Sequence, residues 1–325
     1  MNNSPAVSHA PAVAFFCVSV NPAIDTRLIL DTFIPGKINR VQEVHRAPGG
    51  KAAHVAMALR ALGANPTWIG FSGGATGSEL LHGLQLLQIK TLSIPAAQSS
   101  RVNLEILDTR GEVTELLEPG GTITQPEWAH FQQVCAGAFQ SPARKIAALS
   151  GSLPPGVPPD AYAALIRSAQ SANCLAFLDS SGSPLIEALP ARPDLVKSNS
   201  DEAESVTQIA VRDPASAAQA ARKLLDLGAR SAVVSLGSRG LVGVSQRGAS
   251  AMHAWTAPLR PKSTVGCGDS ALAGLAFANA SGLSFEQGLA LAVACGAANC
   301  LAPLPARLAR EDVSRFEQAV HIEPL

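Results

Sequence analysis

Charged residues are scarce in this chain of 325 residues, of which they make up 15%, against roughly a quarter in a typical soluble domain. Lys and Arg together number 25 and Asp and Glu also 25, so the formal net charge is zero. Without a basic surplus or a cluster of Lys and Arg, the chain has no electrostatic basis for binding nucleic acid or an anionic membrane. Hydrophobic residues, at 47%, suffice for a sizeable core.

Long apolar runs and paired cysteines are also missing. The most apolar stretch, 271–302, is interrupted by polar residues and glycines, so it contains no membrane-spanning run of about 20 apolar residues. The polar start, 1–11, lacks the basic residues of a secretory signal peptide. The six cysteines include no C-x-x-C pair and no zinc-ligand spacing. We therefore expect reduced thiols and a cytoplasmic protein without membrane partners.

Short apolar runs alternate with longer helical patterns over most of the chain. The runs lack strict alternation, as expected for strands that are covered on both faces. The predicted strands are Ala12–Val20, Thr67–Phe71, Ile146–Ser150, Leu175–Asp179, Leu195–Lys197 and Ala232–Ser235. The predicted helices are Lys51–Leu62, Ser78–Leu87, Pro126–Ala138, Pro159–Ser171, Pro214–Leu227, Gly268–Ala280, Ser284–Leu301 and Arg310–Ala319. This order predicts an α/β fold with an open, mostly parallel sheet and helices on both faces.

Two stretches depart from this alternation. Each resembles a pair of strands with polar residues at alternate positions: 27–33 with 39–46, and 101–108 with 112–117. The second pair is joined by a hairpin-like turn, Thr109-Arg110-Gly111. Strands that are polar on one face and inserted early in an α/β chain predict a small sheet that projects as a lid over the active-site edge. We expect one domain over residues 12–320, with lid strands at about 27–46 and 101–117.

The most informative local motif is Gly266-Cys267-Gly268-Asp269, which leads directly into an apolar helix. Glycines at a helix start leave backbone N–H groups accessible, and the helix dipole adds partial positive charge there. Such a turn can stabilise a phosphoryl group. Asp269 beside it could accept a proton from an attacking hydroxyl, although a helix-capping role is an alternative.

Other polar and glycine-bearing segments follow predicted strands. Ser235–Gly240 is a candidate phosphate-binding turn or an ordinary turn, whereas neither a G-x-x-x-x-G-K-[S/T] nor a G-x-G-x-x-G motif occurs. Asp25 follows the first strand, where a carboxylate could hold sugar hydroxyls. Gly49-Gly50-Lys51 opens a helix, and Asn199 with Glu202 matches a helix capping box.

Taken in order, these segments resemble the PfkB, or ribokinase-like, carbohydrate kinases. The branch that phosphorylates hexose phosphates, which includes phosphofructokinases and tagatose-6-phosphate kinase, fits best. The resemblance runs from about Val18 to Asn299 and rests on an ordered series of motifs. The series is Asn21-Pro22-Ala23-Ile24-Asp25, Gly49-Gly50-Lys51, Gly73-Gly74-Ala75-Thr76-Gly77, Arg101-Val102-Asn103, Ser150-Gly151-Ser152-Leu153-Pro154-Pro155-Gly156, Asp179-Ser180-Ser181-Gly182, Asn199-x-x-Glu202, Ser235-Leu236-Gly237 and Thr264-Val265-Gly266-Cys267-Gly268-Asp269.

The resemblance implies ATP-dependent phosphoryl transfer to a hydroxyl of a ketohexose phosphate, with Mg²⁺. It assigns Asp269 as the base and the backbone of Gly266, Cys267 and Gly268 as the anion hole. The ATP ligands it implies are Ser235, Leu236, Gly237, Ser238, Arg239 and Gly240, with Asn299 near the adenine. Asn199 and Glu202 would order Mg²⁺ through water.

The resemblance also implies the acceptor ligands. Asp25, Gly49, Gly50 and Lys51 would contact the sugar, and Lys37, Arg101, Asn103 and Ser152 its existing phosphate. A pair of cations suits a dianion, which favours a phosphosugar. Lid strands of this family can pair between subunits, so a homodimer through the lid is possible.

The helix start departs from this branch, whose usual pattern is Gly-Gly-(Lys or Gly)-Gly-(Ile or Leu)-Asn. Here Ala52 leaves less room for a ligand to approach the backbone. His54 either replaces the amide that is expected to touch the acceptor or is a residue on the helix surface. Cys267 stands where Ala or Ser is common. Two alternatives follow: a kinase of an unphosphorylated sugar or nucleoside on the same fold, and a non-catalytic sugar-phosphate sensor.

Overall fold

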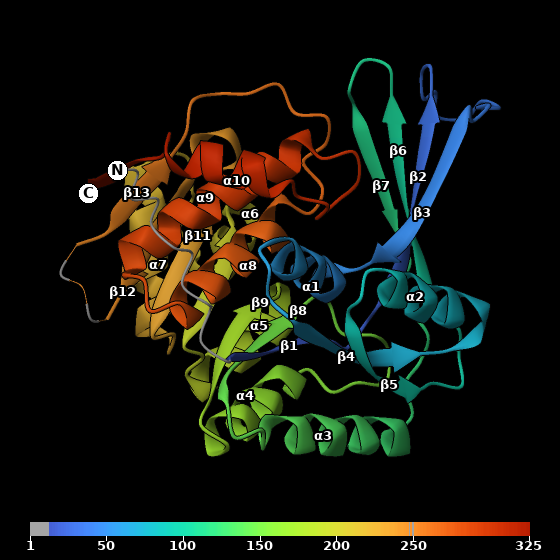
Figure 1. The fold of residues 1–325 in the computed structure, drawn as a ribbon, viewed down its shortest axis with the longest axis horizontal. Helices are drawn as coiled ribbons and strands as arrows, with labels where there is room; N and C mark the ends of the chain where they lie inside the picture. Colours follow the sequence, from blue (N-terminus) through green and yellow to red (C-terminus); the bar gives the residue numbers. More distant parts are fainter. Residues whose placement is uncertain (1–12, 247, 249) are drawn as a thin grey trace, which may run out of the picture.

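The main sheet crosses the whole molecule (Figure 1). The computed structural model describes residues 13–246, 248 and 250–325, so Ala12, the predicted first residue of a strand, lies outside it. The strands run in the order β14-β13-β12-β11-β10-β9-β8-β1-β4-β5. Those from β11 to β5 are parallel, and β12, β13 and β14 form an antiparallel edge. Their bounds are β1 Val13–Ser19, β4 Pro66–Ser72, β5 Lys90–Pro95, β8 Arg144–Ser150, β9 Cys174–Asp179, β10 Leu195–Asn199, β11 Ser231–Ser235, β12 Leu241–Ser245, β13 Met252–Trp255 and β14 His321–Pro324.

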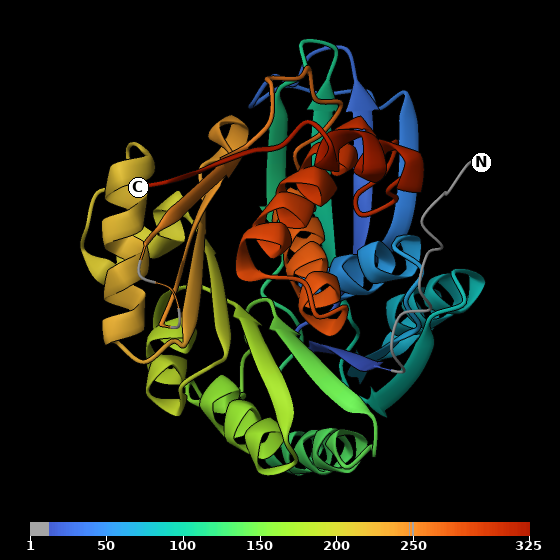
Figure 2. The same ribbon diagram turned by 60° about the vertical axis from the view of Figure 1, so that its left-hand side comes forward.

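Helices cover both faces of this sheet, as predicted (Figure 2). One face carries α1 Lys51–Ala61, α2 Gly74–Leu86, α8 Cys267–Ala280, α9 Phe285–Leu301 and α10 Arg310–Glu317. The other face carries α3 Gln125–Phe139, α4 Ala161–Ser171, α5 Gly182–Ala188, α6 Ser200–Thr207 and α7 Pro214–Asp226. The predicted α/β architecture is therefore confirmed.

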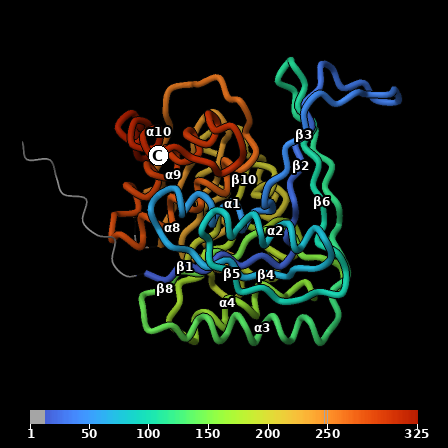
Figure 3. The backbone as a smooth tube through the Cα atoms, turned by 45° about the vertical axis from the view of Figure 1, so that its right-hand side comes forward, coloured from blue at the N-terminus to red at the C-terminus, as the bar shows by residue number. Residues whose placement is uncertain are grey.

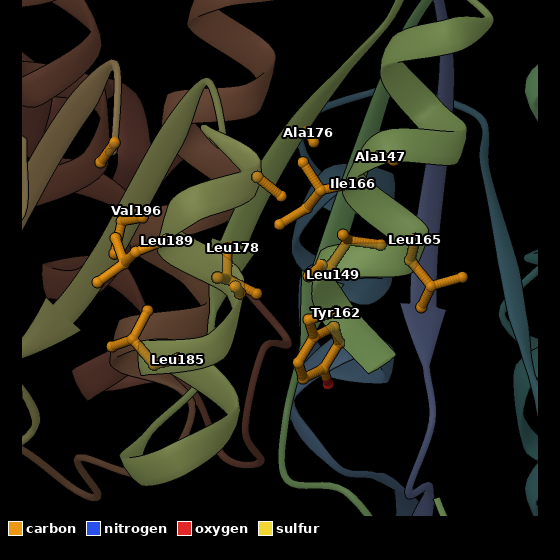
Figure 4. Close-up of a cluster of buried hydrophobic side chains, with 14 of the residues drawn as sticks. Ala147, Leu149, Tyr162, Leu165, Ile166, Ala176, Leu178, Leu185, Leu189 and Val196 are labelled. Carbon is orange, nitrogen blue, oxygen red and sulfur yellow. The ribbon is translucent and has the colours of Figure 1, made fainter. Parts of the chain in front are cut away.

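Two hydrophobic cores lie on the two sides of the sheet. In β8, Ile146 and Ala148 face one core and Leu149 faces the other, because successive side chains of a strand point in opposite directions. Figure 4 shows Tyr162 and Ile166 of α4 packed over the second core. Strands buried on both faces need near-continuous apolar sequence, which explains why these runs were recognisable.

The lid is a separate sheet in the order β3-β2-β6-β7, which projects from the main body (Figure 3). Its bounds are β2 Ala23–Leu30, β3 Glu43–Gly49, β6 Arg101–Asp108 and β7 Val113–Leu117. The predicted small sheet is confirmed, but the outer strand ends were wrong: residues 31–42 form a loop. There the Asn39 side chain binds the backbone of Ile34, and Pro35-Gly36 interrupts the strand.

Several short elements were missed, namely β5, β12, β13, β14 and α5, and of α6 only the capping box at its start was predicted. Helix α2 begins at Gly74, before the predicted Ser78. The four-residue strand β14 owes its conformation to pairing with β13, which is distant in sequence, so no local pattern reveals it. All six cysteines are free. Among the described residues, no helix combines the length and apolarity needed to span a bilayer.

Candidate active site

A cavity of about 840 Å³ lies between the lid and the carboxyl ends of the main-sheet strands, which is where an open α/β sheet binds ligands. The predicted site residues that line it are Asp25, Gly50, Lys51, His54, Arg101, Asn103, Ser152, Asn199, Glu202, Ser235, Gly237, Ser238, Gly240, Gly266, Cys267, Gly268 and Asp269. Those outside its lining are Lys37, Gly49, Leu236, Arg239 and Asn299. Residues from distant parts of the sequence thus converge on one cavity.

The start of α8 presents backbone N–H groups to this cavity. Gly266 is the N-cap residue, with a φ of 80° that suits glycine, and no side chain caps the helix. The amide of Cys267 donates to Thr264 O at 3.2 Å, so it closes the turn. In the part of the chain that the structure describes, the amides of Gly268 and Asp269 donate to no protein acceptor. Asp269 is buried and does not cap the helix, which removes the capping alternative.

Asn299 supports this turn from behind the cavity. Its Nδ2 donates to Val265 O at 2.8 Å, and its Oδ1 accepts the Ala306 N–H at 2.7 Å. The side chain is buried and does not line the cavity. Asn299 therefore ties the turn that precedes α8 to the end of α9.

His54 joins two carboxylates from different elements. Its Nε2 lies 2.9 Å from Asp25 Oδ2 on β2, and its Nδ1 lies 2.8 Å from Asp269 Oδ2 on α8. Burial opposes the charged ring, but hydrogen bonds and charges from both carboxylates raise the pKa of His54 to about 10. Burial also opposes ionisation of Asp25, yet its contacts with His54 and Asn103 lower its pKa. The surface alternative for His54 is wrong, because the ring is buried.

The two glycines before α1, Gly49 and Gly50, hold the Asp25 carboxylate in position. A Cβ at Gly49 would lie 2.1 Å from Asp25 Cγ, so only glycine leaves room for that carboxylate. The Gly50 N–H donates a hydrogen bond to Asp25. Gly49 therefore affects the cavity only through Asp25 and does not itself line it.

Asp179 and Lys197 form a charged network that the sequence analysis missed as a site. Buried Asp179 binds Lys51 Nζ through Oδ1 and Lys197 Nζ through Oδ2, each at 2.5 Å. Burial opposes its ionisation, but the two ammonium groups lower the pKa of Asp179 to about 2. A Cβ at Gly268 would lie 2.8 Å from Lys197 Nζ, which places this ammonium beside the start of α8. A lysine inside an otherwise apolar strand was the available signal.

Asn199 and Glu202 form the capping box of α6. The Asn199 side chain accepts the Glu202 N–H at 2.8 Å, and Glu202 Oε2 accepts the Asn199 N–H at 2.8 Å. Glu202 Oε1 also accepts from Lys51 Nζ at 3.1 Å. The capping prediction is confirmed, and both side chains still line the cavity.

The lid supplies Arg101 and Asn103 to the same cavity. Arg101 Nη1 donates to Glu118 O at 2.8 Å, and Asn103 Nδ2 donates to Asp25 Oδ1 at 2.9 Å. Arg101 Nε and Asn103 Oδ1 are buried without a protein partner, so each can bind a ligand. Lys37 is exposed in the loop 31–42, away from the cavity.

Two lid residues anchor the lid to the main body. Arg27 and Glu105 form a buried ion pair between β2 and β6, with 2.9 Å from Nε to Oε2. Arg27 Nη1 also donates to Pro303 O at 2.7 Å, and Ser263 Oγ donates to Glu105 Oε1 at 3.0 Å. This anchor, defined by Arg27, Glu105, Ser263 and Pro303, fixes the lid close to the segment that precedes α8.

The sequence matches the model of the pfkB family carbohydrate kinases over residues 16–309. This chain belongs to that family. Two relatives are 31% identical to it: the ATP-dependent 6-phosphofructokinase isozyme 2 of Escherichia coli K12, over 89% of this chain and 93% of its own, and a tagatose-6-phosphate kinase of Staphylococcus epidermidis, over 83% and 85%.

Solved structures support the same assignment. Phosphofructokinase-2 from Escherichia coli in complex with potassium has a TM-score of 0.85 and 28% identity, and the match covers 95% of this chain and 98% of that one. Ribokinase from Arabidopsis thaliana has a TM-score of 0.72 at 18% identity over 95% and 99%, a likeness of fold alone. This PfkB kinase therefore has a ribokinase-like fold and is a carbohydrate kinase.

Proposed function

We propose that this PfkB kinase transfers the γ-phosphoryl group of ATP to a hydroxyl of a ketohexose phosphate. The similarity to 6-phosphofructokinase and tagatose-6-phosphate kinase supports this substrate class. The observation that carries the proposal is that one cavity holds a buried carboxylate at a helix start, accessible amides beside it, and an arginine from the lid. We also propose that the described main body and lid act as a single domain.

Asp269 is the proposed base. His54 binds its Oδ2, which leaves Oδ1 for the acceptor hydroxyl. As the hydroxyl oxygen bonds to the γ-phosphorus, its proton passes to Asp269 and the bond to the ADP oxygen breaks. The free amides of Gly268 and Asp269 stabilise the charge on the transferring group. Cys267 contributes the turn that aims these amides, and Gly266 its left-handed cap.

At the acceptor end, Asp25 binds sugar hydroxyls, and Arg101 binds the existing phosphate with help from Ser152. Asn103 was expected at the phosphate, but its Nδ2 already donates to Asp25 and its free Oδ1 is an acceptor, so we propose that it binds a sugar hydroxyl instead. Burial lowers the pKa of the Arg101 guanidinium, and a bound dianion would restore the lost charge stabilisation. Glu115 also lines this end, and burial raises its pKa. Among the residues that the structure describes, Arg101 is the one arginine that lines the cavity, and the acid Glu115 lines the same end. Because an acid disfavours a bound dianion, an unphosphorylated sugar is the second candidate acceptor.

At the nucleotide end, Ser235, Gly237, Ser238 and Gly240 border the phosphates and ribose, while small residues of α9 form an apolar wall for the base. This wall consists of Ala292, Val293, Gly296 and Ala297. Leu236 and Arg239 shape the turn from outside the cavity, since the Leu236 amide donates to Gly240 O at 2.8 Å and Arg239 donates to Arg212 O.

Asn199 and Glu202 could hold Mg²⁺ only together with phosphate oxygens of the nucleotide. Oxygen ligands suit this ion, but both side chains already share hydrogen bonds in the capping box. Among the described residues, no group of three His, Cys, Asp or Glu side chains could hold a metal. These residues would therefore orient metal-bound water, and the ion would neutralise phosphate charge.

The lid suggests a homodimer. Large apolar side chains are exposed on it: Ile34, Ile38, Val41, Val44 and Leu116. Several exposed large apolar side chains on one small sheet and its loop are typical of a protein interface. In sedimentation analysis, the double variant Ile38→Asp with Val44→Asp should become monomeric, whereas Ile186→Asp on α5 should keep the assembly of the native protein. We further propose a reducing, cytoplasmic compartment on the basis of the six free cysteines.

ADP formation with a panel of acceptors tests the proposed function. The panel contains fructose 6-phosphate, fructose 1-phosphate, tagatose 6-phosphate, fructose, ribose and adenosine. We expect the highest kcat/KM with one of the three ketohexose phosphates. Faster turnover of a free sugar or adenosine would favour the second candidate, and tight sugar-phosphate binding without ADP would indicate a sensor.

A further inference from the structure

The imidazole of His54 links the acceptor-binding end of the cavity to the proposed base. Among the described residues, it is the only side chain that contacts both the Asp25 and the Asp269 carboxylate within hydrogen-bond distance, at 2.9 and 2.8 Å. Its side chain is 5% exposed, so water competes poorly for either contact. One ring thus connects β2 of the lid with the first turn of α8.

A count of protons shows what this bridge requires. A neutral imidazole has one N–H, so it can donate to only one of two ionised carboxylates. The second contact would then place a nitrogen lone pair against a carboxylate oxygen. The two short contacts are satisfied together when both ring nitrogens carry protons. The ring in this bridge therefore carries one proton more than a neutral imidazole, while both carboxylates are ionised.

The charges around the ring favour this cation. A small cavity borders His54, and the charged or titratable groups that share its lining are Asp25, Arg27, His45 and Glu105. Asp269 approaches from α8, Glu115 from β7, and Lys51 stands one turn earlier on α1. Arg27 is paired with Glu105, and Lys51 with Asp179 and Glu202. The carboxylates left to face the ring are Asp25, Asp269 and Glu115.

We propose that His54 is a positioning residue that, as an imidazolium, holds the base Asp269 in register with the acceptor held by Asp25. The inference rests on the proposed role of Asp269. The ring fixes Oδ2 of Asp269 and the acceptor-binding carboxylate of Asp25 with the same rigid group. Binding the sugar at Asp25 then aligns its hydroxyl with Oδ1 of Asp269. Loss of the ring proton at high pH breaks one of the two contacts.

The test compares His54→Asn, whose amide stays polar but cannot take up a second proton as the ring does, with His82→Asn on the exposed face of α2. Because small misplacements of reacting groups are costly, His54→Asn should lower kcat by about 10- to 100-fold, while KM for ATP stays unchanged. In the native enzyme kcat should fall as pH rises towards about 10, and His54→Asn should lack this decline. His82→Asn should behave as the native enzyme in both assays.

A stability measurement gives a readout besides activity. The folded pKa of His54, about 10, is above the ordinary 6.5. The protonated ring therefore stabilises the fold fully below pH 6.5, and this contribution is lost as pH rises to about 10. The difference in unfolding free energy between native protein and His54→Asn should shrink over that range. If His54→Asn fails to fold, His54→Gln serves for all measurements.

Three outcomes are distinguishable. Native kcat in His54→Asn, with the alkaline decline retained, overturns the positioning role even if Asp269→Asn is inactive. An active Asp269→Asn enzyme instead overturns the proposed function. A lower kcat with loss of the alkaline decline in His54→Asn alone supports the inference.

A second observation concerns two thiols in the same cavity. Cys267 begins α8, Cys300 lies in the last turn of α9, and their Sγ atoms are 3.3 Å apart. Both line the cavity, so a small solute can reach them. A hydrogen bond from the Cys267 thiol lowers the pKa of Cys300 and raises that of Cys267. The other four cysteines are buried, and burial raises their pKa.

We propose that this thiol pair is an oxidation site for peroxides. The Cys300 thiolate attacks hydrogen peroxide, giving a sulfenic acid and, after protonation, water. The Cys267 sulfur then displaces a second water to form the disulfide. Two thiols and one peroxide thus yield one disulfide and two waters. The new bond ties the start of α8 to the end of α9 and displaces the phosphate turn.

Hydrogen peroxide treatment of the whole protein tests this site. Thiol titration should show the loss of two thiols, peptide mapping should join Cys267 to Cys300, and kcat should fall by about tenfold or more until dithiothreitol restores it. Cys300→Ser should keep its own untreated rate, and Cys174→Ser should still be inhibited. Absence of the cross-link, or a cross-link that leaves kcat unchanged, overturns the proposal.

Discussion

The two ends of the cavity are built by different means. At the proposed phosphate turn, residues 266–269, backbone amides at the start of α8 face the cavity, and their direction follows from the helix itself. At the proposed acceptor end, side chains from β2, β6 and α1 converge, and their positions depend on contacts such as that between Gly49 and Asp25. A backbone site is encoded by a few consecutive residues, whereas a side-chain site is encoded by the whole fold.

The largest expected effect is at the junction of the two ends. Replacing Asp269 with Asn keeps the shape but removes the proposed base, so kcat should fall by about 10²–10⁴. ADP release with the best acceptor gives the rate, and circular dichroism checks the fold. Turnover within a few-fold of native would refute Asp269 as the base. The proposed division of the cavity into a phosphate end and an acceptor end would then lose its support.

Arg101→Gln tests the acceptor end alone. A hydrogen bond to a charged group contributes about 1.5–3 kcal/mol, so KM for the sugar phosphate should rise by roughly 10- to 100-fold. KM for ATP should stay the same. Arg110→Gln at the exposed hairpin of the same sheet is the matched control. An equal rise in both KM values would contradict a role confined to the acceptor.

Gly49→Ala tests whether the acceptor end depends on close packing. The new Cβ would overlap Asp25 Cγ, and overpacking of this kind costs about 1–3 kcal/mol. The midpoint of thermal unfolding should drop and KM for the acceptor should rise. Gly137→Ala in α3, where a Cβ meets nothing within 4 Å, should not lower the midpoint. Similar behaviour of both variants would argue against packing as the reason for Gly49.

The smallest effect is expected at the lid anchor. Ser263→Ala removes the hydrogen bond to Glu105, which should cost about 1–2 kcal/mol of unfolding free energy in denaturant titration. Ser171→Ala, an exposed residue at the end of α4, should stay within about 0.5 kcal/mol of native. An unchanged Ser263→Ala would show that Arg27 and Pro303 alone hold the lid.

These differences explain what the sequence could predict. The turn Gly266 to Asp269, the capping box at Asn199 and the buried strands are local patterns, and the structure has them where they were expected. The burial of His54 depends on Asp269, 215 residues away in the sequence, and the pairing of Asp179 with Lys197 depends on which strands lie side by side in the sheet. Lys37 lies between the two predicted strands, in a loop that the structure extends to residues 31–42, and only the fold shows that this exposed side chain does not line the cavity.

The lid anchor also determines what release of product requires. Arg27 and Glu105 both belong to the lid, so their ion pair travels with it as a unit. Moving the lid away from the main body would break the bonds to Pro303 and Ser263, which water can replace. It would also break two charged contacts, Arg46 with Glu79 on α2 and Asp25 with the imidazolium of His54 on α1. Each opening of the lid would therefore separate opposite charges at two places.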